Sequence, residues 1–219
     1  MYKRQEWVRP SRPYKNDTII FYCHGGGFYT GSLEYARTLT TKLALSSSME
    51  LLSFNYRLAP ESPSPAALED VLEIWNHLMH LGYGAKQIIV AGDSAGGNLA
   101  LALGLKLKEE GRMLPKGFVL FSPWTNLTLK GESITKKAEL DPILNYEYLE
   151  EARIAYVPSG EHDETVYEDP LISPLFGDYK HFPPVYIQVG SNEVLLNDST
   201  DLKKHLNAQK VDVRLDLYK

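Results

Sequence analysis

The sequence predicts an α/β fold in which a mainly parallel sheet is flanked by helices on both faces. Apolar runs of strand length recur along the chain, and segments with helical apolar spacing, bounded by Pro and Gly, separate them. This alternation is typical of parallel sheets, because the crossover between parallel neighbours is usually a helix. The 219 residues contain no internal repeat and fit one domain, 1–219.

The strands are expected where apolar residues run without alternation, as in TIIFYC, because strands covered on both faces need no polar side. They cover 18–23, 50–55, 87–91, 117–122, 184–189 and 211–217. The helices between them cover 34–47, 65–81, 96–110 and 197–208.

The pattern changes between residues 131 and 180, where no strand is expected. Residues 137–157 have the apolar spacing of an amphipathic helix, and an acidic, turn-rich run follows that we expect to be a solvated loop. Fifty residues exceed an ordinary connection in a compact domain. We therefore expect 131–180 to be an insertion with its own helices, a reduced helical cap packed over the edge of the sheet.

The composition excludes several classes of protein. Hydrophobic residues make up 43% and charged residues 23%, as in soluble globular domains, and the net charge of -5 leaves no basic excess for nucleic acid or anionic lipid. The single cysteine, Cys23, cannot form an intrachain disulfide. No apolar run approaches the roughly 18 residues of a membrane span, and the first residues, MYKRQEW, lack the apolar run of a signal peptide, so we expect a cytoplasmic protein.

The strongest chemical signal is the run Gly92-Asp93-Ser94-Ala95-Gly96, between an expected strand and an expected helix. A sharp strand-to-helix turn places a serine in a strained conformation, and small residues two before and two after it let the chain turn without clashes. The serine then stands at a helix N-terminus, where backbone N–H groups and the helix dipole stabilise negative charge. Ser94 is therefore a candidate nucleophile.

A second signal follows the first expected strand, where His24 precedes three consecutive glycines and Phe28. Glycines leave backbone N–H groups open to the close approach of a ligand oxygen, so the segment is a candidate oxyanion loop. The alternatives are a flexible turn and a phosphate cradle. The cradle is disfavoured because neither the P-loop lysine nor a G-x-G-x-x-G spacing is present.

These motifs occur in an order that resembles the serine esterases related to hormone-sensitive lipase, a branch of the α/β-hydrolases. The resemblance rests on HGGGF at 24–28, YRLAPESPSPAALED at 56–70, GDSAGG at 92–97, SPWTNL at 122–127, DP at 141–142 and FPPVYIQVGSNEVLLNDS at 182–199. It spans nearly the whole chain. It implies an α/β-hydrolase fold and hydrolysis of carboxylic esters by a Ser–acid–His triad, with a small-molecule ester substrate and without a metal or organic cofactor.

The resemblance also implies residue roles. Ser94 is the nucleophile, the N–H groups of Gly25, Gly26 and Ala95 form the oxyanion hole, and His24 braces that loop. The motif at 56–70 is expected to buttress the active-site loops. Aromatic residues at such spacings usually belong to the core, and only Phe28 and Trp124 are expected near the substrate. Short-chain acyl esters are the expected substrates.

The triad acid is expected in the loop after strand 184–189. Asn192 cannot ionise, whereas Glu193 can accept a hydrogen bond from an imidazole and balance the imidazolium formed during catalysis, so Glu193 is the preferred acid. Asp198 is the fallback. Its simpler interpretation is a carboxylate favoured by the N-terminal dipole of the following helix.

The triad base has no evident candidate. In this fold the histidine follows the next strand, yet only His205 follows Glu193, and it lies within an expected helix as a surface residue. Only about 17 residues precede the first strand. The chain therefore looks like a fragment of a longer enzyme, or a shortened one, and a serine without its base loses roughly a million-fold in rate.

Two further interpretations stay open at this stage. A non-catalytic binder of small molecules on the same scaffold would keep the pocket and lack turnover, and the absence of a base favours it. A structural interaction protein would have no pocket around Ser94. The oligomeric state is not indicated by the sequence.

Overall fold

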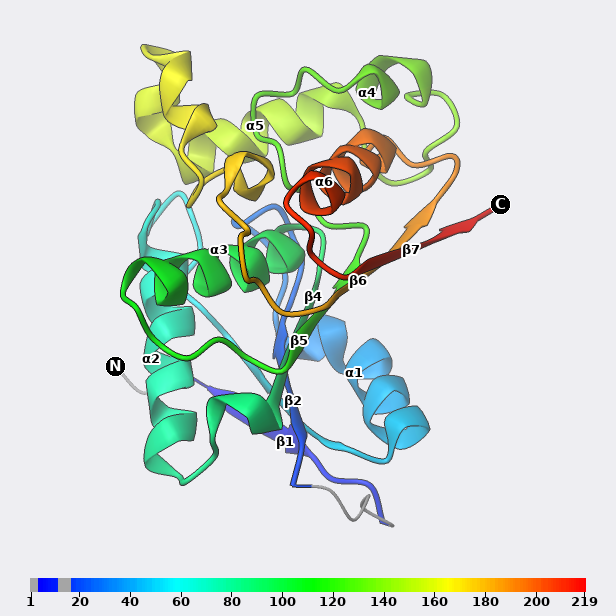
Figure 1. Ribbon diagram of the computed structural model, residues 1–219. Helices are drawn as coiled ribbons and strands as arrows, with labels where there is room; N and C mark the ends of the chain where they lie inside the picture. The colour runs from blue at the N-terminus through cyan, green and yellow to red at the C-terminus, as the bar shows by residue number, and fades with distance from the viewer. Residues whose placement is uncertain (1–3, 12–16) are drawn as a thin grey trace.

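The computed structural model describes residues 4–11 and 17–219 as a sheet covered by helices on both faces (Figure 1). Within these residues the sheet has seven strands in the order β1-β3-β2-β4-β5-β6-β7, and every neighbouring pair except β1–β3 is parallel. The strands are β1 Gln5–Val8, β2 Ile19–Cys23, β3 Glu50–Phe54, β4 Ile88–Asp93, β5 Gly117–Phe121, β6 Val185–Gly190 and β7 Val213–Tyr218. All six expected strands and the mainly parallel sheet are confirmed.

The sequence did not predict β1. This strand has four residues and pairs antiparallel with β3 at the edge of the sheet, where Gln5 lies opposite Phe54 and Val8 opposite Leu51. A short edge strand buries little apolar surface, so it carries little of the hydrophobic signal from which strands are predicted.

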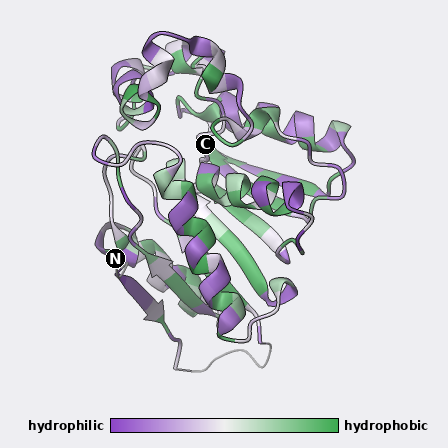
Figure 2. Cartoon of the chain, turned by 90° about the vertical axis from the view of Figure 1, so that its left-hand side faces the viewer, coloured by the Kyte–Doolittle hydropathy of each residue, from purple (hydrophilic) through white to green (hydrophobic). Residues whose placement is uncertain are grey.

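Helices cover the two faces of the sheet unequally. They are α1 Leu33–Ser47, α2 Ala66–His80, α3 Ala95–Glu109, α4 Glu132–Lys136, α5 Tyr146–Tyr156 and α6 Leu196–Ala208. The apolar residues of α1 form a small cluster with one face of β2, β3 and β4, whereas those of α2, α3 and α6 join the main core on the other face. Figure 2 shows that second side, where helices that carry both hydrophilic and hydrophobic residues lie in front of largely hydrophobic strands.

Local signals account for the helix ends. The side chain of Ser32 accepts a hydrogen bond from the N–H of Tyr35 and so caps the start of α1, and Ser48 ends that helix with a φ of 55°. The helix α3 is buried along nearly its whole length, which explains its run of leucine and alanine.

In Figure 1 the helices of the segment 131–180, α4 and α5, lie beyond the carboxyl ends of the strands, and the end of the segment runs back past α3 towards the start of β6. The helix expected over 137–157 is shorter than predicted. It begins at Tyr146, because Pro142 lies before it and the side chain of Asn145 accepts from the N–H of Tyr148 as its N-terminal cap. The acidic run that follows forms short 3₁₀ turns, Pro158–Glu161 and Glu164–Glu168.

Candidate active site

Ser94 occupies the turn between β4 and α3 in a conformation that non-glycine residues rarely adopt. Its φ is 52° and its ψ is -121°. Three hydrogen bonds hold this backbone: the N–H of Ser94 donates to the carbonyl of Phe121 at 3.0 Å, and its carbonyl accepts from the N–H groups of Trp124 at 3.0 Å and Asn98 at 3.2 Å. Ser94 as a residue is partly exposed. Strain maintained in this way at an accessible serine is a feature of functional sites.

The glycines on either side of Ser94 are required by close backbone packing. A Cβ atom at Gly92 would lie 2.5 Å from the carbonyl carbon of Gly96 and 2.8 Å from the oxygen of Cys23. A Cβ atom at Gly96 would lie 2.5 Å from the oxygen of His24 and closer still to that of Cys23. Ordinary contacts of this kind are 3.4–4 Å. The turn therefore packs directly against the end of β2. The loop that begins there, residues 24–28, contains the three consecutive glycines and is called the triple-glycine loop below.

The triple-glycine loop differs from its prediction in one respect. The N–H of Gly25 donates to Oδ1 of Asp93 at 2.9 Å, so this group is occupied and is not a free oxyanion donor. The N–H groups of Gly26 and Gly27 have no hydrogen-bond partner among residues 4–11 and 17–219. Ala95 is the first residue of α3, where N–H groups lack intrahelical acceptors. The available donors of this region are thus Gly26, Gly27 and Ala95.

The resemblance pointed to Gly25 and Gly26 and not to Gly27, whose N–H is open within the part of the chain that the structure describes. Its φ of 59° and that of Gly26, 119°, lie in the region that glycine tolerates. The carbonyl of Gly26 accepts from the N–H of Tyr29 at 3.2 Å and that of Thr30 at 2.8 Å. The loop is therefore a fixed turn, not a flexible one.

The ring of His24 contacts the backbone of the triple-glycine loop, as expected of a residue that supports this loop. Its Nδ1 lies 2.7 Å from the carbonyl oxygen of Gly25, and its ring stacks on Tyr56 with 4.2 Å between ring centroids. The hydroxyl of Tyr56 donates to the carbonyl of His24 at 2.8 Å. Burial lowers the pKa of His24, against a raising effect of its bond to Gly25, so the ring is neutral at physiological pH.

Asp93 joins the loop to the nucleophile turn. Its Oδ1 accepts from the hydroxyl of Tyr22 at 2.7 Å as well as from Gly25. Burial raises the pKa of Asp93, although both hydrogen bonds favour the ionised form. Because Asp93 immediately precedes Ser94, this carboxylate fixes the distance between the turn and the loop.

Glu193 lies in the turn after β6, at the same edge of the sheet as Ser94, because β4, β5 and β6 are parallel neighbours. Its Oε1 accepts from the N–H of Gly190 at 2.7 Å, and its side chain is partly exposed. The turn is held from the 131–180 segment: Asp141 Oδ2 accepts from the N–H of Val194 at 2.9 Å, and Ser133 Oγ donates to the carbonyl of Val194 at 2.6 Å.

The carboxylate of Asp198, the fallback acid, binds backbone N–H groups of the loop after β5. Asp198 is 3% exposed, and its Oδ1 accepts from the N–H groups of Thr125 and Asn126, both at 2.8 Å. Burial raises its pKa to about 7, although these two bonds favour the charged form. The carboxylate of Asp198 therefore stabilises the backbone of the loop after β5.

None of the six histidines, all within the described residues, forms a hydrogen bond with Ser94 or Glu193. His205 is partly buried, not a surface residue as predicted. Its Nε2 lies 2.7 Å from the carbonyl of Gly177, and its ring contacts Tyr179 edge-on. His77, His80, His162 and His181 are exposed.

Phe28 and Trp124, expected near the substrate, are fully buried at 0% exposure. The ring of Phe28 stacks on Tyr156 of α5 with 3.8 Å between centroids and contacts Trp124 at 5.7 Å. The structure therefore places both side chains in the core beside the triple-glycine loop and not on an open pocket wall. Aromatic burial outweighs accessibility here because α5 covers the loop.

The motif at 56–70 has the buttressing contacts that were expected of it. The N–H of Ala59 donates to the carbonyl of Phe28 at 3.0 Å, and the N–H of Ser64 donates to the carbonyl of Tyr156 at 2.7 Å. Within the motif, the Nε of Arg57 donates to the buried carboxylate of Asp70 at 2.9 Å. The motif thus connects the triple-glycine loop to α5.

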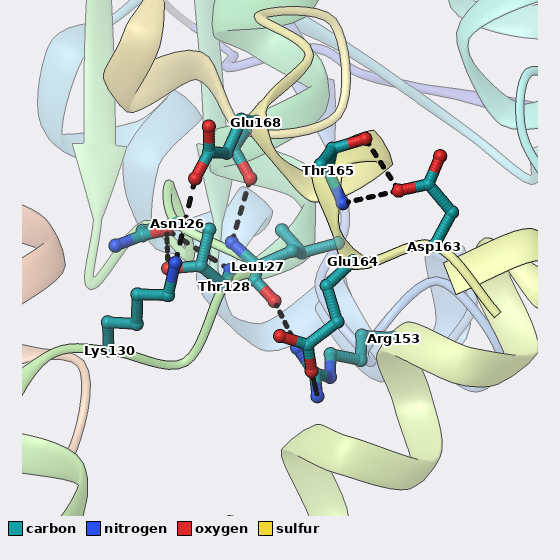
Figure 3. Close-up of polar contacts among 10 residues, drawn as sticks. Asn126, Leu127, Thr128, Lys130, Arg153, Asp163, Glu164, Thr165 and Glu168 are labelled. Carbon is teal, nitrogen blue, oxygen red and sulfur yellow. Dashed lines mark hydrogen bonds and ion pairs between the residues drawn. The ribbon is translucent and has the colours of Figure 1, made fainter. Parts of the chain in front are cut away.

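Arg153 of α5 is a further structural residue that sequence reasoning missed. Figure 3 shows its guanidinium directed at the carbonyl of Leu127 and at Glu164; the distances are 3.2 and 3.4 Å. It also pairs with Glu150 at 2.6 Å and lies over the ring of Tyr167 at 4.5 Å. A buried arginine with these partners fastens the 131–180 segment to the loop after β5.

Comparison with known proteins agrees with this arrangement. A family model described as the alpha/beta hydrolase fold matches residues 20–219. The chain is 40% identical over 200 residues to an esterase of Acinetobacter venetianus, covering 91% of this chain and 65% of the relative, and 36% identical to an acetyl-hydrolase of Streptomyces hygroscopicus, covering 91% and 64%. It therefore spans about two thirds of the length of these curated relatives.

Solved structures give the same result. A crystal structure of an esterase from the bacterial hormone-sensitive lipase family superposes with a TM-score of 0.92 at 35% identity, covering 99% of this chain and 71% of that one. A hormone-sensitive lipase from a metagenome library superposes with a TM-score of 0.89 at 40% identity, covering 97% and 69%.

These relatives are named as hydrolases, so the interpretation as a non-catalytic binder is not favoured. Among the helices of the described residues, none has the length and apolar character needed to cross a bilayer. The chain belongs to the alpha/beta hydrolase family and, within it, to the esterases related to hormone-sensitive lipase.

Proposed function

We propose that this chain carries the nucleophile, the oxyanion hole and the triad acid of a carboxylic ester hydrolase that acts on short-chain acyl esters. The observation that carries the proposal is the strained, partly exposed Ser94, which packs beside a loop with two unpartnered backbone N–H groups. A strained serine and free amides at one sheet edge fit acyl transfer better than any binding role.

The reaction follows from the groups present. Ser94 Oγ loses its proton to a base and attacks the ester carbonyl carbon, and the carbonyl electron pair moves to oxygen. The N–H groups of Gly26, Gly27 and Ala95 stabilise this oxyanion, where a single donor typically contributes about 3–4 kcal/mol. Collapse of the intermediate expels the alcohol and leaves an acyl-enzyme, which water hydrolyses by the same steps.

Glu193 is the proposed acid. Its carboxylate orients an imidazole and balances the charge of the imidazolium that forms when the base accepts the serine proton. None of the six histidines of residues 1–219 has the contacts of such a base. We therefore treat the imidazole as a group to be supplied in the experiment.

Preference for short acyl chains has two supports. The stacked rings of Phe28 and Tyr156, with the tilted ring of Trp124 beside them, fill the space next to the triple-glycine loop. Similar proteins are named acetyl-hydrolase and ethyl acetate hydrolase; the second, from Pseudomonas putida, is 29% identical and covers 95% of this chain. A small acyl group is the substrate that these features favour.

The test is hydrolysis of p-nitrophenyl acetate by a polypeptide of residues 1–219, with and without added imidazole, beside the Ser94→Ala variant. We expect a rate near background without imidazole, because loss of the base costs roughly a million-fold. Each rate is corrected for hydrolysis by imidazole without protein, because free imidazole itself cleaves this ester. Above that rate, we expect an increase with imidazole that Ser94→Ala lacks. Equal rates for the two proteins with imidazole would disprove the nucleophile, and rapid Ser94-dependent turnover without imidazole would show that the chain holds its own base.

A further inference from the structure

The carboxylate of Asp198 lies between the two parts of the site that must act together. It stands in the first turn of α6, five residues after Glu193, and it is almost fully buried. A single oxygen of Asp198, Oδ1, accepts hydrogen bonds from the successive N–H groups of Thr125 and Asn126. The hydroxyl of Thr125 also donates to the backbone carbonyl of Asp198 at 3.1 Å. Three hydrogen bonds thus join the start of α6 to the loop after β5.

The same loop holds the backbone of the nucleophile. Trp124, directly before Thr125, donates its N–H to the carbonyl of Ser94 at 3.0 Å, and the N–H of Ser94 donates at 3.0 Å to the carbonyl of Phe121, the last residue of β5 before this loop. The side chain of Asn98 donates to the carbonyl of Trp124 at 2.9 Å. A shift of this loop would therefore act directly on the strained φ and ψ of Ser94.

At the other end, α6 continues without a break from the turn that bears Glu193. Leu196, the first residue of α6, donates its N–H to the carbonyl of Glu193 at 3.2 Å. The side chain of Asn197 accepts from the N–H of Ser133 at 2.6 Å, and the N–H of Asn197 donates to Ser133 Oγ at 3.0 Å. The turn that bears Glu193 and the first turn of α6, which bears Asp198, are therefore held together by hydrogen bonds.

We propose that Asp198 is a positioning residue that fixes the turn bearing Glu193 relative to the backbone of Ser94, through the loop 122–127. This rests on the proposed function, since the relative position of acid and nucleophile matters only if Ser94 attacks an ester. A buried oxygen that accepts two adjacent N–H groups leaves the loop little freedom, because an unpaired N–H there would be costly.

The test compares three variants of residues 1–219. Asp198→Ala removes the acceptor. Asp198→Asn keeps an oxygen in place with two lone pairs for the two N–H groups. Asp201→Asn is the matched control, because Asp201 lies on the same helix and its ion pair among the described residues is with Lys204, at the surface. Amide hydrogen exchange of segments 92–97 and 122–127 is measured, together with kcat and KM for p-nitrophenyl acetate in added imidazole.

For Asp198→Ala we expect exchange roughly ten-fold faster in both segments, including the N–H of Ser94. We also expect kcat to fall roughly 100-fold with little change in KM, since small displacements of reacting groups cost that much. Asp198→Asn and Asp201→Asn should match the unchanged protein in both measurements. A merely stabilising role would leave kcat of the folded Asp198→Ala protein unchanged, and that result would overturn the proposal.

Faster amide exchange of Asp198→Ala that is confined to 122–127, with the N–H of Ser94 unaffected, would also overturn the proposal. If no Ser94-dependent turnover occurs in any protein, the proposed function fails, and exchange at Ser94 still decides whether Asp198 positions the turn. If Asp198→Ala does not fold, Thr125→Val removes only the hydroxyl bond to Asp198. This milder variant should speed exchange in both segments by a smaller factor, and an effect confined to 122–127 would again contradict the proposal.

Discussion

Gly96→Ala tests the packing of the nucleophile turn on the triple-glycine loop with a single methyl group. The added Cβ would lie 2.5 Å from the carbonyl oxygen of His24 and 2.6 Å from the carbonyl carbon of Cys23. These atoms belong to the backbone at the end of β2, which is bonded to β3 and β4 on its two sides. They cannot move as the end of a flexible side chain would.

The magnitude follows from this geometry. Relief of the overlap requires the end of β2 and the start of α3 to separate by about 1 Å, since ordinary contacts begin at 3.4 Å. Overpacking of this kind costs about 1–3 kcal/mol or more, against a gain of about 1 kcal/mol for alanine over glycine in a helix. We expect the free energy of unfolding to fall by about 2 kcal/mol. Imidazole-supported turnover should fall roughly 100-fold, because the oxyanion donors move with the strand.

Urea denaturation followed by circular dichroism measures the first effect, and p-nitrophenyl acetate hydrolysis measures the second. Gly84→Ala is the matched control. Its φ is -76°, and the nearest atom to an added Cβ is the side-chain oxygen of Gln87 at 3.3 Å. We expect its stability to change by less than about 0.5 kcal/mol. A Gly96→Ala protein as stable and as active as the unchanged chain would refute the packing described here.

Two further predictions concern buried charges. The pKa of Asp198 is raised from 3.8 to about 7, so the folded state binds more protons than the unfolded state between these values; its contribution to stability should fall as pH rises through that range, by on the order of 4 kcal/mol. Urea titrations at several pH values should show this slope in the unchanged protein and its loss in Asp198→Asn, and equal slopes would contradict the prediction. Arg153→Ala should lower the free energy of unfolding by about 3 kcal/mol, because it leaves the partly buried Glu150 without its cation and the carbonyl of Leu127 without a donor. The pair of Arg214 and Asp216, in which the arginine itself is exposed, is the comparison, and Arg214→Ala should cost less than about 1 kcal/mol; similar losses for both arginines would show that Arg153 does not fasten α5.

The parts of the fold that the sequence predicted are those with strong local signals. The central strands are continuous apolar runs such as IIFYC in β2, whose five residues are all buried. Ser94 was found because the turn that exposes it needs glycine at Gly92 and Gly96, and glycine is visible in the sequence. Where the physical requirement is local, the residue type reports it directly.

The remaining features depend on partners distant in the chain. The N–H of Gly25 is occupied by Asp93, 68 residues away, and no spacing within the triple-glycine motif reveals this. The burial of Phe28 depends on Tyr156 of α5, and the role of Asp198 depends on Thr125, 73 residues earlier. The edge strand β1 is defined by pairing with β3 and not by its own apolar content.

The measurement that tests the central claim most directly is covalent trapping of the serine. Residues 1–219 are incubated with a small p-nitrophenyl phosphonate ester and imidazole, and the product is examined by intact mass and peptide mapping. An activated hydroxyl beside the Gly26, Gly27 and Ala95 amides predicts one adduct per chain, located on Ser94 and absent from Ser94→Ala. Adducts spread over other residues, or equal labelling of the Ser94→Ala protein, would contradict the account.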